Sequence, residues 1–226
     1  MSRLKTLLSW STGKDSAWAL QLLRDDPAID VVGLFSTVNQ AFERVAMHGV
    51  RVELLRRQAA SAGLPLHLIE IPHPCSNAEY TQAMDAFIAQ ARGEGVERFA
   101  FGDLFLQDIR RYREQSLQGS GIEPLFPLWG LPTAELAAAM IAGGLQARIT
   151  CVDPRRVPAA WCGRRFDAAL LAELPAGVDP CGEYGEFHSF AFAGPMFREP
   201  IALRVGITLE RDGFVFTDLL PEGPAR

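Results

Sequence analysis

Apolar and polar positions follow two different periods along the chain until about residue 145. Short apolar runs typical of buried strands occupy residues 4–10, 31–37, 66–71 and 98–103. Between these runs, apolar residues recur every three or four positions, which is typical of helices that bury one face. Strands that alternate with helices in this way predict an α/β fold built on a doubly wound parallel sheet.

The pattern changes after residue 145. Proline and glycine interrupt the chain repeatedly, and the tail alternates in two strands, residues 202–210 and 214–220, joined by an Arg-Asp-Gly turn. We therefore expect a larger domain over residues 1–145 and a smaller α+β domain over residues 146–226. The absence of a low-complexity linker indicates that the two domains pack together.

Composition narrows the class of protein. The chain has 226 residues and is 48% hydrophobic, which is enough apolar surface to form a hydrophobic core. Its net charge of -5 disfavours an extended nucleic-acid-binding surface, which is normally basic. No apolar run approaches the length of a membrane crossing or the form of a signal peptide, which predicts a cytoplasmic protein with no membrane partner. The four cysteines form no C-x-x-C pair, so neither a zinc knuckle nor a disulfide framework is indicated.

The stretch between the first strand and the first helix carries most of the predicted chemistry. It reads Ser11-Thr12-Gly13-Lys14-Asp15-Ser16. Backbone N–H groups of such a loop, together with the positive end of the helix that follows, form a cradle for phosphate. A Walker A loop is excluded, because Leu8 stands where its first glycine is required and Asp15 follows the lysine. The other interpretation is a simple helix cap by Asp15 or Ser16.

These six residues resemble the S-G-G-K-D-S loop of the PP-loop ATP pyrophosphatases, which cleave ATP between its α and β phosphates. Thr12 replaces the usual first glycine, which narrows the geometry open to the loop. The resemblance implies that ATP contacts the whole loop, that Lys14 and Asp15 are catalytic, and that Asp15 is a ligand of Mg²⁺. Lys14 and Ser16 are expected on an exposed loop with little core burial.

Other residues are placed near the nucleotide by their position in the fold. Ligands of a doubly wound sheet bind beyond the carboxyl ends of its strands, where Ser36, Gly102 and Asp103 fall. We expect these residues to contact the nucleotide, although Asp103 is also placed to cap a helix that begins near residue 104. His48 is left open between a nucleotide contact and a structural role on a partly apolar helix face.

A second unusual stretch, residues 180–190, places two carboxylates and an imidazole beside two glycines. A strand from Glu186 would direct Glu186 and His188 to one face. Glycines beside clustered acids indicate close approach of the backbone to a ligand, whereas an edge with solvated charges is the ordinary alternative. We assign Glu183 and Glu186 to catalysis on the acceptor side, because clustered carboxylates repel a triphosphate and favour ammonium or a cationic acceptor.

Together, these segments resemble the diphthine-ammonia ligase family, and the resemblance covers nearly the whole chain. It rests on the loop, on Gly102-Asp103, on the G-E-x-G-E-F signature at residues 182–187, and on residues 46–51, 123–129 and 149–153. Residues 47–51 look more like the bacterial branch of the family. The C-terminal domain is then expected to bind substrate.

The resemblance implies an ATP-dependent amide-forming ligase. Such an enzyme adenylates a carboxylate, releases AMP and pyrophosphate, and uses ATP, Mg²⁺ and ammonia or ammonium. The carboxylate acceptor, small or protein-borne, is not identified by the sequence, and a homodimer is left open.

Two other functions stay open at this point. An RNA-thiolation enzyme or another adenylating PP-loop enzyme would call for paired cysteines and a basic groove, and the sequence displays neither. A nucleotide-binding sensor without turnover is disfavoured by the glycine, lysine and acidic groups retained around the loop.

Overall fold

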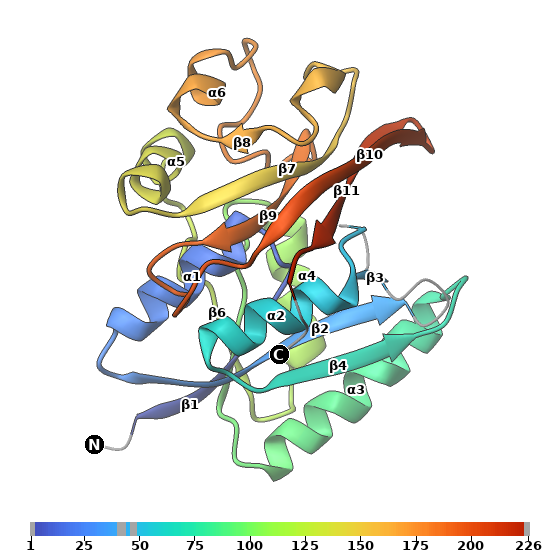
Figure 1. Cartoon of the computed structure of the whole chain (residues 1–226). Coiled ribbons are helices and arrows are strands. Elements are labelled where there is room, and N and C mark those ends of the chain that lie inside the picture. Colours follow the sequence, from blue (N-terminus) through green and yellow to red (C-terminus); the bar gives the residue numbers. More distant parts are fainter. Residues whose placement is uncertain (1–2, 40–43, 46–48, 224–226) are drawn as a thin grey trace.

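The computed structural model describes residues 3–39, 44–45 and 49–223 of the chain. These residues form a mainly parallel sheet from the N-terminal part and an antiparallel sheet from the C-terminal part, packed together as Figure 1 shows. Among the described residues, no helix is both long and apolar enough to span a bilayer.

The first sheet confirms the predicted doubly wound parallel fold. Its strands are β1 (Leu4–Ser9), β2 (Ile29–Asn39), β3 (Arg44–Val45), β4 (Leu66–Ile71), β5 (Arg98–Ala100) and β6 (Glu123–Leu125). The parallel strands lie in the order β4-β2-β1-β5-β6, and β3 pairs antiparallel with the end of β2. The chain order reverses between β1 and β5, which makes the carboxyl ends of these two strands the expected position of a ligand.

Helices cover both faces of this sheet, and the two-residue period of the strands explains how. The helices are α1 (Lys14–Asp25), α2 (Val52–Ala62), α3 (Asn77–Gly93) and α4 (Gln107–Leu117). Neighbouring residues of β1 point to opposite faces, so Leu8 packs in one core with residues of α1 and α2. Leu7 packs in the other core with residues of α3 and α4. Both leucines are almost completely buried.

The C-terminal sheet is antiparallel and smaller. Its strands are β7 (Gln146–Val152), β8 (Arg165–Phe166), β9 (Phe187–Ala193), β10 (Leu203–Arg211) and β11 (Phe214–Pro221), accompanied by α5 (Thr133–Ala142), the 3₁₀ helix η1 (Ala159–Trp161) and α6 (Ala168–Ala172). The predicted hairpin joins β10 and β11. Its turn residues Asp212 and Gly213 have φ values of 54° and 79°, as a tight two-residue turn between twisted strands requires.

The second sheet packs on the α1 and α2 face of the first. One continuous apolar core joins residues of both sheets. Strand β9 runs beside the loop after β1, and the backbone N–H of Ala191 donates to the Thr12 carbonyl at 2.9 Å. On α2, the Ser61 hydroxyl donates to the Glu199 carbonyl and accepts from the Glu199 N–H. The C-terminal part therefore covers the predicted phosphate loop.

Candidate active site

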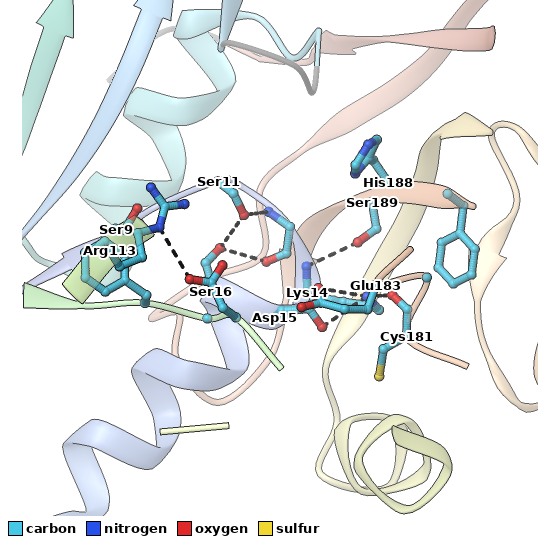
Figure 2. A pocket seen from close by; sticks show the side chains of 16 residues that line it. Ser9, Ser11, Lys14, Asp15, Ser16, Arg113, Cys181, Glu183, His188 and Ser189 are labelled. Carbon is cyan, nitrogen blue, oxygen red and sulfur yellow. Dashed lines mark hydrogen bonds and ion pairs between the residues drawn. The ribbon is translucent and has the colours of Figure 1, made fainter. Parts of the chain in front are cut away.

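A cavity of about 210 Å³ lies at the carboxyl ends of β1 and β5. Residues 13–16 and 101–103 line it from the first sheet, and residues 181–183 and 187–189 line it from the C-terminal part. Ser11 and Arg113 also line it. The structure thus brings together the phosphate loop, the Gly102-Asp103 pair and the Glu183 turn, which are far apart in the sequence. Figure 2 shows Ser11, Asp15 and Glu183 around this cavity.

The phosphate loop leads directly into α1. Gly13 is the N-cap of this helix, and no side chain caps it, so the interpretation of Asp15 or Ser16 as a simple cap is wrong. The first N–H groups of a helix lack partners within the helix and attract anions. The close approach of the β5 end requires Gly102, because a Cβ there would lie 3.1 Å from the Ser16 backbone nitrogen.

Thr12 adopts a conformation that suits glycine. Its φ of 72° lies in the left-handed region, which is uncommon for a β-branched residue and costs about 1–3 kcal/mol. The buried Thr12 side chain does not line the cavity. The Thr12 backbone carbonyl points away from the cavity and accepts from the Ala191 N–H. A trans peptide directs its N–H opposite to its carbonyl. The Thr12 carbonyl therefore directs the Gly13 N–H to the cavity side, where it meets the Ser11 hydroxyl at 3.4 Å.

Gln58 of α2 holds this peptide in place. Its side chain is completely buried and donates to the carbonyls of Thr12 at 3.0 Å and Ala191 at 2.6 Å, while its oxygen accepts from the Trp10 indole N–H at 2.8 Å. The sequence interpretation missed this residue. The signal was a glutamine four residues after Leu54, on the face of α2 that the apolar pattern predicts to be buried.

Lys14 and Ser16 are each 2% exposed, so the expectation of an exposed loop with little burial is wrong. The C-terminal part covers them. The Lys14 ammonium donates to the Asp15 carboxylate at 2.8 and 3.0 Å and to the Cys181 carbonyl. Burial, the largest single influence, lowers the pKa of Lys14, but the Asp15 carboxylate together with Cys181 and Glu183 raises that pKa above its ordinary value. Lys14 is therefore a charged group fixed beside the cavity.

Glu183 and Asp103 face the cavity with different partners. The Glu183 carboxylate accepts the Leu104 backbone N–H at 2.9 Å, and burial, with the nearby Asp15 and Asp103 charges, raises the pKa of Glu183 to about 7. The Asp103 carboxylate accepts from the Arg113 guanidinium at 3.4 Å. Glu183 therefore changes its charge near neutral pH.

The structure does not bring Glu186 to the cavity. Strand β9 begins one residue later, at Phe187, so Glu186 lies in the preceding turn, and it does not share a cavity-facing surface with His188 as expected. Its fully buried carboxylate accepts from the Asp179 N–H at 3.2 Å and from Arg156 at 3.1 Å. Glu186 thereby holds the turn that carries Glu183.

Of the other predicted contacts, Ser36 does not line the cavity. Ser36 is buried in β2, away from the residues that line it, and His48 lies outside the described residues. His188 does line the cavity, and burial lowers its pKa to about 4, so this imidazole is neutral at physiological pH.

The cavity also contains polar residues that were not assigned to the site from the sequence. The Ser189 hydroxyl accepts the Lys14 backbone N–H at 3.2 Å, and Arg113 lines the cavity beside Asp103. Ser189 is three residues beyond Glu186 in the unusual stretch, and its polar type at a buried strand position was the available signal.

A phosphate-type loop at the reversal point of a doubly wound sheet, closed over by a second sheet, is an arrangement typical of α/β proteins that bind a phosphorylated ligand. Residues 4–124 match the family described as diphthamide synthase N-terminal domain, and residues 133–214 match its diphthamide synthase C-terminal domain. The chain belongs to this family.

Two curated relatives are both named diphthine–ammonia ligase. The chain is similar to diphthine–ammonia ligase of Homo sapiens, with 27% identity over 217 residues that span 84% of this chain and 79% of that protein. It is also similar to diphthine–ammonia ligase of Rattus norvegicus, with 28% identity over 116 residues that span 49% of this chain and 43% of that protein.

Proposed function

We propose that this protein is an ATP-dependent ligase that adenylates a substrate carboxylate, releases pyrophosphate, and transfers ammonia to form an amide and AMP. The observation that carries the proposal is the single cavity shared by the phosphate loop and the Glu183 turn. The names of the two relatives, diphthine–ammonia ligases, support the same reaction type. Residues 1–145 would bind ATP, and residues 146–226 would supply the acceptor side.

The phosphate loop would act on the ATP half of the reaction. A carboxylate is a poor acyl donor until its oxygen is joined to AMP, and charge accumulates on pyrophosphate as it leaves. The loop N–H groups, the Ser11 and Ser16 hydroxyls and the Lys14 ammonium would stabilise that charge. Loss of one such fixed donor typically costs about 3 kcal/mol in the transition state.

Magnesium would be held by the Asp103 carboxylate together with the phosphates, whereas both oxygens of Asp15, the ligand expected from the resemblance, already accept from the Lys14 ammonium. Asp103 lines the cavity, and a Mg²⁺ site in nucleotide enzymes commonly needs one or two carboxylates besides the phosphates. The described residues contain no cluster of three metal-ligating side chains. The ion, when bound, would supply further neutralisation of phosphate charge.

Glu183 would act on the acceptor half. With a pKa of about 7, it is able to take a proton from ammonium near neutral pH. The resulting ammonia would form a bond to the acyl carbon, the bond from that carbon to the AMP oxygen would break, and a second proton would leave the nitrogen for water. Diphthine, named for the relatives, is one candidate acceptor.

The structure gives less support to sulfur transfer. Cys181 lines the cavity, but burial raises the pKa of its thiol to about 12, so it is not a thiolate nucleophile.

The test is a reaction of purified protein with ATP, magnesium, ¹⁵N-ammonium and a cell extract. The expected result is AMP, pyrophosphate and a product in which one oxygen is replaced by ¹⁵N-labelled NH. A matched reaction with Lys14→Ala should lack all three. Amide formation that proceeds equally without ATP would refute the proposal.

A further inference from the structure

The Lys14 ammonium lies beside Asp15 and Cys181 at the edge of the cavity (Figure 2), in a group of side chains and backbone atoms that we call the cage. Its acceptors are both oxygens of Asp15 and the carbonyl of Cys181. The ring centroids of Phe166 and Phe187 lie 5.6 and 5.4 Å from its nitrogen, within the range of cation–π attraction. With Lys14 only 2% exposed, the cage fits a primary ammonium group and excludes bulk water.

The proposed role of Lys14 requires it to leave this cage. A primary ammonium has three N–H donors, and here three acceptor atoms of the cage surround them. A phosphate group in the cavity would compete for the ammonium with more negative charge than Asp15 alone. The lysine stem is flexible enough to turn toward that phosphate.

Departure of Lys14 would leave a partly buried carboxylate, a carbonyl and two aromatic faces without their cation. A buried charge without a partner is unfavourable, so the vacated cage would attract a replacement cation of the same size. Phe187, Asp15 and Cys181 all line the cavity described above, and the replacement would therefore enter from the side where the phosphate is bound.

We propose that the vacated cage binds the ammonium ion that supplies the amide nitrogen. The ion has the charge and the N–H donors of the lysine head group without its stem. This inference rests on the proposed function and adds an order of binding: the nucleotide draws Lys14 away first, and ammonium then takes its place. Glu183 lines the same cavity, where it is available to take a proton from the ion.

The first experiment measures ammonium binding without turnover. Lys14→Ala empties the cage permanently, so ammonium chloride should raise the melting temperature of this variant in a saturable way, whereas sodium chloride and tetramethylammonium chloride at equal ionic strength should not. The unchanged protein should respond to ammonium only when pyrophosphate is present. Equal responses to ammonium and sodium in both proteins would overturn the inference.

The second experiment alters the cage without touching the rest of the cavity. Phe166 is buried in the cage but does not line the cavity, so Phe166→Leu should weaken ammonium binding about fivefold to tenfold and leave ATP binding unchanged. The matched control is Phe190→Leu, at a fully buried phenylalanine of β9 whose side chain is on the strand face opposite to Phe187. Both variants should lose stability, but the control should keep its ammonium affinity.

The outcomes separate this inference from the proposed function. Ammonium-dependent amide formation with an ammonium KM unchanged by Phe166→Leu would refute the cage and keep the ligase. Saturable ammonium binding by Lys14→Ala, together with an unchanged protein that never releases AMP, would keep the cation site and refute the ligase. If Lys14→Ala does not fold, the unchanged protein with pyrophosphate decides, and a response to ammonium equal to that to sodium would count against the cage.

Discussion

Replacing Gln58 with leucine tests whether the buried carboxamide shapes the phosphate loop. The change removes the acceptor of the Trp10 N–H and one donor each to the Thr12 and Ala191 carbonyls. The Thr12 carbonyl still accepts a hydrogen bond from the Ala191 N–H, so it loses one of its two hydrogen bonds and keeps the other. Each buried polar group left without a partner costs about 1–3 kcal/mol, and burial of the apolar leucine side chain offsets part of this cost. We therefore expect the free energy of unfolding to fall by about 2–3 kcal/mol. In a domain of this size that corresponds to roughly 4–12 °C in melting temperature.

The specific effect should appear in pyrophosphate binding. A Thr12 peptide that is free to rotate would misdirect the Gly13 N–H, and we expect pyrophosphate affinity to fall about 10- to 100-fold, somewhat less than the loss of a whole catalytic donor. Isothermal titration calorimetry with pyrophosphate measures this directly.

The control for Gln58→Leu is Ser61→Ala, which removes another buried polar contact between α2 and the C-terminal part, away from the loop. It should lower stability and leave pyrophosphate affinity unchanged. A Gln58→Leu protein that loses stability but binds pyrophosphate as tightly as the original would refute the reasoning.

The remaining predictions concern the cavity wall. Gly102→Ala should lower pyrophosphate affinity and cost about 1–3 kcal/mol of stability, because its Cβ would press on the Ser16 backbone at 3.1 Å; normal calorimetric binding would contradict this. Glu183 has its pKa raised from 4.5 to about 7, so the folded state holds the proton more tightly, and stability from this group is lost as pH rises through that window. Melting curves should show the original protein losing stability relative to Glu183→Gln between those pH values, and parallel curves would refute the raised pKa. Glu186→Gln should spare ATP binding while slowing amide formation, since Glu186 supports the Glu183 turn; normal amide formation would show that this support is dispensable.

Local pattern was enough to predict most of the first sheet. The apolar run at residues 66–71 coincides with β4, and the strand predicted at residues 4–10 is β1 with one residue fewer. The strand predicted at residues 98–103 ends at Ala100, because Phe101 to Asp103 leave the sheet to meet the start of α1. A run of apolar residues does not reveal where a strand leaves its neighbours.

The environment of Lys14 could not be predicted in this way. Its burial depends on Cys181 and Phe187, which lie more than 160 residues later and reach it only after the two sheets dock. Glu186 lies in the turn before β9 and bonds to Asp179 and Arg156, so the two-residue alternation of a strand could not predict where its side chain lies. Contacts between segments that are far apart in the sequence leave no trace in the local hydrophobic pattern of either segment, so that pattern could not predict them.

The measurement that tests the central claim most directly is the identity of the nucleotide product. The protein is incubated with ATP, magnesium, ammonium and an extract that contains the acceptor, and the nucleotides are separated by ion-exchange chromatography. A pyrophosphate loop that serves adenylation predicts AMP and pyrophosphate in equal amounts, and both should be lost with Lys14→Ala. Acceptor-dependent release of ADP and phosphate would contradict the account.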